Sequence, residues 1–371
     1  MLLLLIALLL CVCADPPPRF EQGARQHQRP KQHSSSSHTQ HVRGSREQRP
    51  RPLVVGTMTT TPVRLKEIEG DLGRCLLLLL AMPRLDRLYL NVPWSYELRG
   101  ASIGDPLNSS ASAPAAAGPG HGPNITLPAA LLSLAKGSQG RMHITRCKDY
   151  GPATKLLPTL LQPNHAVPPD SILITFDDDR LYTPAAIDTL VNNSLARPDT
   201  VISIAAWSVS ILSSSGRRGL PRGPDFYSAV PPQLEGLQYV KEGRVDLING
   251  FYGVAYRKSM FFEHEHKSER GGRGVRELFN YSASPACERH CKMVDDIWLS
   301  GHLERLGVAR IVVGRSTLDI CANPSALSNM GGLSLEGVRE SARQNEDNVH
   351  CAQAMRDVWG IWAQGGKHMA K

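Results

Sequence analysis

The feature that most constrains the fold is a short apolar run that ends in three consecutive aspartates. Residues 172–176 read Ile-Leu-Ile-Thr-Phe, and Asp177, Asp178 and Asp179 follow directly. An apolar, β-branched run of this length predicts a buried strand of an α/β sheet. Pro184 then opens a helical pattern, at the position where a helix tolerates proline. Because open α/β sheets bind ligands outside the carboxyl ends of their strands, we expect the aspartates at the mouth of a site.

The chemistry of three adjacent carboxylates narrows the kind of site. The carboxylates repel one another, so their proton affinity rises unless a cation neutralises them. Ligand atoms that are all oxygen favour a hard divalent ion such as Mg²⁺ or Mn²⁺. A solvated acidic turn is the alternative. Since the aspartates directly adjoin a buried run, we predict a divalent-metal site.

The chain before this segment is predicted to form half of a nucleotide-binding unit. Residues 53–58 and 85–93 have the apolar character of strands. Between them, apolar residues at intervals of three and four predict an amphipathic helix: Leu65, Ile68, Leu72, Cys75, Leu76 and Leu79. Arg64, at the start of this helix, is a candidate contact for a pyrophosphate, with a solvated arginine as the alternative.

A turn and a lysine follow a third predicted strand, residues 141–147. The turn spans Asp149 to Pro152, and we expect a helix after it. That helix would carry Lys155 in its first turns, toward the sheet edge that bears the aspartates. A positive charge near a helix N-terminus is suited to a phosphate leaving group.

Three motifs in this order resemble those of a group of glycosyltransferases with the GT-A fold. They are Thr-Thr-Pro-x-Arg at residues 60–64, Asp-Tyr-Gly-Pro-Ala-Thr-Lys at 149–155, and Asp-Asp-Asp with a nearby Tyr-x-Pro at 177–184. The resemblance covers roughly residue 53 to the C-terminus. It implies an α/β fold with a Rossmann-like, mostly parallel sheet flanked by helices. It also implies a nucleotide-sugar donor, a glycan or glycoprotein acceptor, and Mn²⁺ or Mg²⁺ as cofactor.

The resemblance further implies roles for individual residues. Asp177 would contact the ribose or sugar of the donor and share the metal, and Asp179 would bind Mn²⁺ across the diphosphate. Lys155, and Arg64 with it, would offset the charge on the leaving nucleoside diphosphate. The other donor-binding candidates in these motifs are Asp149 and Asp178.

Two later segments, residues 200–206 and 245–256, are also predicted strands. The second is interrupted by Gly250 and Gly253, and glycine inside a strand marks a bulge or a close approach of backbone to ligand. In GT-A enzymes a comparable segment lines the donor sugar and the acceptor. Asn249, Gly250 and Gly253 are therefore candidates for donor binding.

A second acidic point, Asp295 and Asp296, precedes a helical pattern over residues 297–306. Acidic residues at a helix start are often caps that interact with the helix dipole, which explains one aspartate better than two. By the resemblance, Asp296 is the candidate base that takes a proton from the acceptor hydroxyl in an inverting transfer, and Asp295 orients the acceptor. A retaining reaction, which needs no such base, is the alternative.

A last helix is predicted from residue 348 onward, and it contains His350. GT-A enzymes often complete the metal shell with a histidine from the C-terminal region, which makes His350 a candidate ligand. A histidine packed on the surface is the alternative.

The amino-terminal residues predict entry into the secretory pathway. Residues 1–14 are nearly all apolar but too few to span a bilayer as a helix, so they fit a signal peptide or a short anchor. Residues 15–52, with eight Lys and Arg against three Asp and Glu, are predicted to be a disordered stem. Residues 99–123 resemble a low-complexity insertion in one large α/β domain, residues 53–371. We expect a Golgi or ER location and possible membrane association through the amino terminus, and no nucleic-acid partner.

Cysteines and glycosylation sequons agree with an oxidising lumen. Six cysteines lie beyond the leader: Cys75, Cys147, Cys287, Cys291, Cys321 and Cys351. We expect the last four to form two bridges, and Cys75 to be a buried thiol or a partner of Cys147. Sequons for N-glycosylation begin at Asn108, Asn124, Asn192 and Asn280.

Two other functions compete with glycosyl transfer. A phosphotransferase with an aspartate nucleophile would need Thr or Val where Leu181 stands, which disfavours it. A non-catalytic, metal-dependent carbohydrate-binding protein on the same fold would not need both acidic points.

Overall fold

The structure is a computed structural model of the 371-residue chain. It describes residues 51–66, 68–96, 125–178, 180–207, 243–250, 253–262, 277–313 and 341–362. From Leu53 onward the described residues belong to one compact unit. The predictions for residues 1–14, the stem up to residue 50, the 99–123 insertion, Asp179 and Cys321 fall outside the described residues. No helix in the described ranges is long and apolar enough to cross a membrane.

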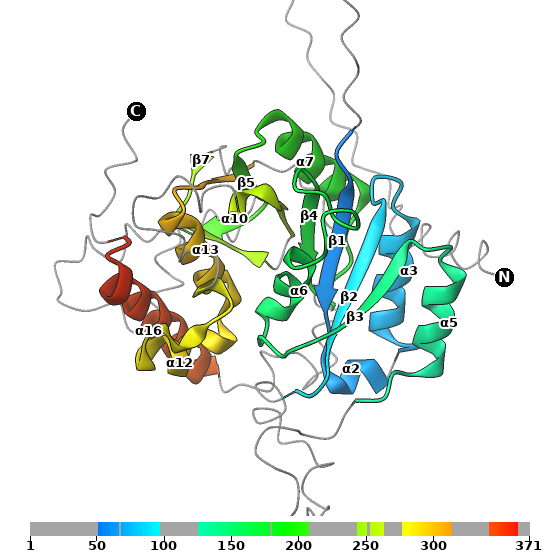
Figure 1. Cartoon of the computed structure of the whole chain (residues 1–371), viewed down its shortest axis with the longest axis horizontal. Helices are drawn as coiled ribbons and strands as arrows, with labels where there is room; N and C mark the ends of the chain where they lie inside the picture. Colours follow the sequence, from blue (N-terminus) through cyan, green and yellow to red (C-terminus); the bar gives the residue numbers. More distant parts are fainter. Residues whose placement is uncertain are drawn as a thin grey trace, which may run out of the picture. The chain divides into compact units, whose positions relative to one another are not determined.

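The centre of the fold is an eight-stranded mixed sheet (Figure 1), with strand order β3-β2-β1-β4-β9-β5-β10-β7. The four strands from β3 to β4 are parallel, and β5 is parallel to β10, whereas β9 and β7 run antiparallel to their neighbours. This confirms the predicted α/β class with a mostly parallel central sheet. The strands are β1 Val54–Thr59, β2 Arg87–Pro93, β3 Met142–Cys147, β4 Ile172–Phe176, β5 Thr200–Ser203, β7 Gly243–Arg244, β9 Val254–Arg257 and β10 Ala309–Val312.

Helices cover both faces of this sheet because successive strand residues point to opposite sides. Val54 and Ile174 belong to a hydrophobic cluster with residues of the helices α3, α5 and α7, whereas Val55 and Leu173 belong to a second cluster with residues of α6, α13 and α16. The helices are α2 Pro62–Lys66, α3 Asp71–Ala81, α5 Ala129–Gly137, α6 Leu157–Leu160, α7 Pro184–Ala196, α10 Ser259–Phe262, α12 Pro285–His290, α13 Asp295–Arg305 and α16 Ser341–Trp359. Three short 3₁₀ turns are η1 Ala153–Lys155, η5 Tyr281–Ala283 and η6 Cys291–Met293.

The segment from Ile172 to Pro184 has the predicted form. β4 is fully buried, and α7 begins at Pro184, with the side chain of Thr183 accepting a hydrogen bond from the Ala186 N–H. The N-cap and the proline together fix the start of this helix. Asp177 and Asp178 therefore lie in the short connection between a buried strand and a capped helix.

The helix predicted after the first strand is in fact two helices, α2 and α3. The chain turns between them, and Gly70 precedes α3 with non-helical backbone angles. Gly73 allows this turn to be tight, since a Cβ at that position would lie 2.0 Å from the carbonyl oxygen of Ile68. The six apolar residues of the predicted pattern are nevertheless all buried. Periodicity identified the buried face correctly and missed the break.

The two later strands are also divided. Ala206–Trp207, β6, leaves the main sheet and pairs with β8, Leu247–Ile248, in a separate two-stranded sheet. β9 begins only after Gly253, whose φ of +89° is a conformation that side-chain-bearing residues rarely adopt. The glycines predicted as interruptions thus mark the point where the chain returns to the central sheet.

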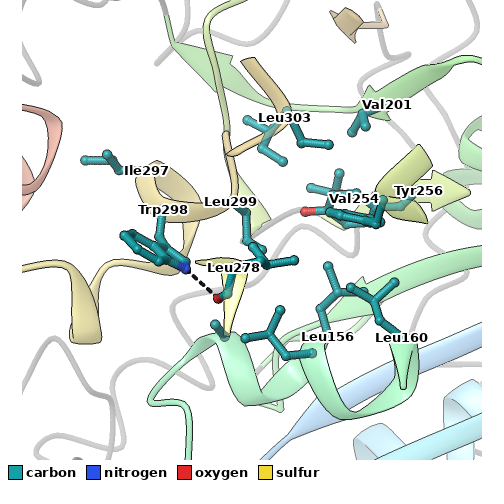
Figure 2. Close-up of a cluster of buried hydrophobic side chains, with 14 of the residues drawn as sticks. Leu156, Leu160, Val201, Val254, Tyr256, Leu278, Ile297, Trp298, Leu299 and Leu303 are labelled. Atoms are coloured by element: carbon teal, nitrogen blue, oxygen red, sulfur yellow. Dashed lines mark hydrogen bonds between the residues drawn. The ribbon is translucent and has the colours of Figure 1, made fainter. Parts of the chain in front are cut away.

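The carboxyl-terminal helices pack on Trp298 of α13, which is fully buried. Its indole nitrogen donates a hydrogen bond to the carbonyl oxygen of Leu278 at 3.0 Å, as Figure 2 shows. A disulfide joins Cys291 to Cys351 and so ties η6 to α16.

The second predicted bridge is not formed among the described residues. Cys287 is a buried thiol whose pKa is raised by burial, and Cys321 lies outside the described ranges. Cys75 is not bridged to Cys147; its thiol contacts the carbonyl oxygen of Arg180 at 3.3 Å. Its position on the core side of its helix agrees with the buried-thiol alternative.

Reduction of the Cys291–Cys351 bridge should lower the free energy of unfolding by about 2–4 kcal/mol, because the bridge restricts a long loop in the unfolded chain. Denaturation with and without a reductant measures this loss. The double variant Cys291→Ser/Cys351→Ser is the control and should show no further loss on reduction. Equal reductant sensitivity in the wild type and the double variant would contradict the assignment.

Candidate functional site

The two acidic points meet at one buried lysine. The Lys155 Nζ lies 2.6 Å from Oδ1 of Asp177 and 3.0 Å from Oδ2 of Asp295. Asp177 follows the last residue of β4, and Asp295 is the first residue of α13. Residues more than 100 positions apart in the sequence are thus held together at the carboxyl end of the central strands, as predicted for a ligand site.

The backbone of Lys155 is held by a buried polar network beneath it. Its carbonyl oxygen accepts hydrogen bonds from the hydroxyl of Thr57 and from the side-chain amide of Asn91. The Asn91 amide also contacts the hydroxyls of Thr57 and Thr159, at 3.1 and 3.0 Å. All of these side chains are fully buried. Since buried polar groups are costly when unpaired, this network fixes the 3₁₀ turn on the sheet.

Asp177 is oriented by an aromatic pair. Its backbone N–H donates to the hydroxyl of Tyr182 at 2.9 Å, and the Tyr182 ring packs edge-on against Phe176 with centroids 4.6 Å apart. Tyr182 is almost fully buried. The first residue after β4 therefore has a fixed backbone from which its carboxylate reaches Lys155.

The carboxylate of Asp296 is held by the backbone of Gly250. The Gly250 N–H donates to Oδ1 of Asp296 at 2.9 Å. A Cβ at Gly250 would lie 2.7 Å from that oxygen and 3.2 Å from the Lys155 Nζ. This close approach explains why the chain has glycine here, and it brings the predicted residue Gly250 into the charged cluster.

The contact between Lys155 and Asp295 differs from the contact between Lys155 and Asp177. Oδ2 of Asp295 is buried and makes no hydrogen bond of good geometry, although it lies 3.0 Å from the ammonium. We therefore regard this contact as an ion pair without directional hydrogen bonding. Asp177, in contrast, accepts a hydrogen bond from the same nitrogen.

The charges in this cluster are not balanced. Burial alone would lower the pKa of Lys155, but the three carboxylates of Asp177, Asp295 and Asp296 raise it well above its usual value. Burial, with Asp295 next, raises the pKa of Asp296 well above its usual value, although Lys155 opposes this shift. Burial, and next Asp296 and Asp295, also raise the pKa of Tyr256. One ammonium among three carboxylates leaves excess negative charge, which favours binding of a proton or a cation.

Asp178 points to a different partner from its neighbour. It forms an ion pair with Arg64 and accepts a hydrogen bond from the Thr60 hydroxyl at 2.6 Å. All three side chains are buried. Arg64 and Asp178 thus offset each other's charge, and the pair joins the start of α2 to the end of β4. Their predicted contacts with the donor diphosphate stay predictions.

Three other predicted residues lie next to the cluster in supporting positions. Asp149 accepts hydrogen bonds from the Gly151 N–H at 2.9 Å and from the Thr154 hydroxyl at 3.5 Å, so it holds the turn that leads to Lys155. The Asn249 N–H donates to the Ala205 carbonyl. A Cβ at Gly253 would meet Leu190 at 3.2 Å, so this glycine serves the packing of β9.

His350 is not brought to the carboxylates by any contact in the described structure. It is exposed on α16, and its ring lies against that of His290 in a tilted arrangement, with centroids 4.7 Å apart. No group of three His, Cys, Asp or Glu side chains in the described ranges has the arrangement of a metal site. Its predicted role as a ligand therefore has no structural support here and stays a prediction.

Thr57, Asn91 and Tyr256 also belong to the site, but they were not among the residues predicted from the sequence. Asn91 carried a readable signal, because a polar residue in the middle of an apolar strand must find buried partners. Tyr256 carried none, since an aromatic residue in a strand normally indicates packing alone.

Comparison with known proteins adds little to this geometry. Neither a scan of protein-family models nor a search of curated proteins found a match. Among solved structures, the chain is similar to 4-diphosphocytidyl-2C-methyl-D-erythritol synthase from Anaerococcus prevotii, with 14% identity, a TM-score of 0.33, and coverage of 63% of this chain and 84% of that one. A second structure of such a synthase has 10% identity, a TM-score of 0.37, and coverage of 76% and 97%. Values this low support no conclusion about the function of this chain.

Replacement of Lys155 by methionine should leave three carboxylates without their shared counter-charge. We expect a loss of about 3–5 kcal/mol in the free energy of unfolding at pH 7, the usual cost of breaking a buried ion pair. Lys155 opposes the rise in the pKa of Asp296, so without Lys155 that pKa would lie still further above its unfolded value, and this loss should shrink as the pH falls from 7 toward 4. Urea denaturation at several pH values measures it.

Lys136→Met, at an exposed lysine of α5, is the matched control. It should change the free energy of unfolding by less than about 0.5 kcal/mol. A loss that is equal in the two variants, or independent of pH in Lys155→Met, would show that Lys155 does not stabilise the cluster.

Proposed function

We propose that the chain is a glycosyltransferase that moves a sugar from a nucleotide-sugar donor to a hydroxyl of a glycan or glycoprotein. The observation that carries this proposal is the meeting of two acidic points, Asp177 and Asp295-Asp296, at Lys155. A transfer of this kind needs one group of residues for the donor and a base for the acceptor. The first acidic point lies at the donor-binding edge expected of the sheet, and the second supplies the base.

In this proposal Asp296 takes the proton from the acceptor hydroxyl as that oxygen attacks the anomeric carbon. The raised pKa of Asp296 makes its carboxylate a stronger base than an ordinary aspartate. The Gly250 N–H holds one carboxylate oxygen, which leaves the other to face the acceptor. Lys155 fixes Asp295 beside it, so Asp295 is a positioning residue for the acceptor side.

Lys155 and Arg64 are already paired with aspartates, so the donor diphosphate requires a further source of positive charge. The carboxylate oxygens and the excess negative charge suit a hard divalent cation. Asp177 offers one carboxylate, and the remaining protein ligands would be Asp179 and His350, the first of which lies outside the described residues. When bound, Mn²⁺ or Mg²⁺ would offset the charge on the departing nucleoside diphosphate.

We also propose a location in the secretory pathway, in the Golgi or the ER lumen. The sequons at Asn192 and Asn280 are exposed, so both are accessible for glycosylation. The Cys291–Cys351 bridge is typical of an oxidising compartment.

Replacement of Asp296 by asparagine should reduce transfer by about 100-fold or more, because the amide cannot accept the acceptor proton. Donor binding should persist, since the donor contacts lie at the other acidic point. The measurements are nucleoside diphosphate release and donor-dependent thermal shift across a panel of nucleotide sugars. Asp188→Asn on the surface of α7 is the matched control and should behave as the wild type.

The stereochemistry of the product tests the same base independently. If Asp296 activates the acceptor, the first-formed product has the anomeric configuration opposite to that of the donor, which NMR detects. A product with the donor's own configuration would remove Asp296 from this role and favour the retaining alternative. Donor binding without any turnover in the wild type would favour the non-catalytic carbohydrate-binding protein.

Replacement of Asp179 by asparagine should abolish Mn²⁺-dependent transfer while leaving the melting temperature of the metal-free protein within about 2 °C of the wild type, because the amide keeps the shape but loses the charge that binds the ion. Activity and thermal shift with and without Mn²⁺ measure both effects, again with Asp188→Asn as control. Retained activity with unchanged metal dependence would contradict the assignment of Asp179.

A further inference from the structure

A cavity lies at the opposite end of the strands from the charged cluster. It has a volume of about 460 Å³ and is lined by residues of β2, β3 and the loop after α6. Arg87 is the first residue of β2 and His143 the second residue of β3, so the cavity opens near the amino ends of these parallel strands. Asp177, in contrast, follows the carboxyl end of β4. The cavity is therefore separate from the proposed transferase site.

The position of β3 explains why a cavity forms here. β3 is the edge strand of the described sheet (Figure 1), and η1 and α6 contact β2 on the side that contains Tyr89. Tyr89 and His143 are paired across the two strands, and their rings stack with centroids 4.9 Å apart. Beyond these rings the sheet face is bordered by the loop that carries His165. The result is a recess with an aromatic floor.

The polar groups of this recess have one electrostatic character. Arg87, His143, His165, Gln162 and Thr145 line it, and no aspartate or glutamate is among the lining residues. Arg87 is the only lysine or arginine among the lining residues. Arg87, His165, Gln162 and Thr145 can each donate a hydrogen bond, and an oxyanion accepts several such bonds at once.

Arg87 and His143 have hydrogen-bonding groups that are not used by other described residues. Arg87 uses one guanidinium nitrogen on the carbonyl oxygen of Ala166, which anchors it to the loop and leaves its other N–H groups for a ligand. Nε2 of His143 is buried and has no hydrogen-bond partner among the described residues. Burial of the ring, and next the positive charge of Arg87, lower the pKa of His143 against an opposing hydrogen bond with the Gly140 backbone, which favours the neutral imidazole. Buried polar atoms without partners are uncommon in folded proteins.

We propose that this recess is a binding site for a small phosphorylated sugar, with the phosphate at Arg87 and His143. A volume of about 460 Å³ lies in the range of small-molecule sites and accommodates a hexose phosphate. Arg87 provides a planar set of donors that suits a phosphate, and Nε2 of the neutral His143 accepts a hydrogen bond from a protonated phosphate oxygen, because the other ring nitrogen interacts with the Gly140 backbone. Gln162, Thr145 and His165 provide polar partners for the sugar hydroxyls.

Calorimetric titration of the full chain with glucose 6-phosphate tests this site. We expect saturable binding that inorganic phosphate displaces, and no binding of glucose itself. Arg87→Gln and His143→Gln should each weaken binding at least 10-fold, because each removes one contact with the phosphate. Arg74→Gln, at an exposed arginine of α3, is the control for loss of one positive charge and should leave the affinity unchanged.

Three outcomes would overturn the proposal: no saturable binding, equal affinity for glucose and glucose 6-phosphate, or unchanged affinity in both Arg87→Gln and His143→Gln. Arg87 also holds the loop, so its variant must first be shown to fold by circular dichroism. If Arg87→Gln does not fold, His143→Gln alone decides, because that substitution removes no contact between side chains other than the stacking on Tyr89. None of these results depends on transferase activity.

Discussion

The buried ammonium of Lys155 is the interaction on which the arrangement of the site depends. Asp177 is more than 100 residues away in the sequence from Asp295 and Asp296. Because these carboxylates gather around one ammonium, they would repel one another without that shared cation. Lys155 is itself held by Thr57 and Asn91 in neighbouring strands. The charge is therefore anchored to β1 and β2, the two inner strands of the parallel part of the sheet.

The mixed topology of the sheet explains how the second acidic point reaches the first. β9 is inserted antiparallel between β4 and β5, so the connection before it crosses the carboxyl ends of the parallel strands. Gly250 lies in that connection and contacts Asp296. A purely parallel sheet with helical crossovers would not have placed this backbone N–H over the site. The antiparallel strand thus has a direct part in the geometry of the acidic cluster.

Much of this fold follows from patterns in the sequence. The strand at 172–176 and the start of the helix at Pro184 were predictable because hydrophobic runs, proline and an N-cap act locally. The break between α2 and α3 was not predictable. The close approach of Gly73 to the Ile68 carbonyl oxygen depends on the path of the chain in space, and it leaves the spacing of apolar residues at three and four intact. In the site, the sequence predicted that Lys155 points toward the sheet edge bearing the first acidic point, and the resemblance implied that the second acidic point acts on the same reaction. It did not reveal that Lys155 would be paired with them, since ion pairing depends on side-chain directions that no pattern encodes.

The absent side chain of Gly250 has a consequence for anyone who maps this protein by mutation. Any substitution there would push a carbon atom against a carboxylate oxygen and toward an ammonium nitrogen. A residue with no functional group would then score as severely as the charged residues around it. Mutational sensitivity at Gly250 would reflect the lack of room for a side chain between the Asp296 carboxylate and the Lys155 ammonium. A survey that ranks positions by loss of activity would therefore include Gly250 in the site, although it contributes no side chain.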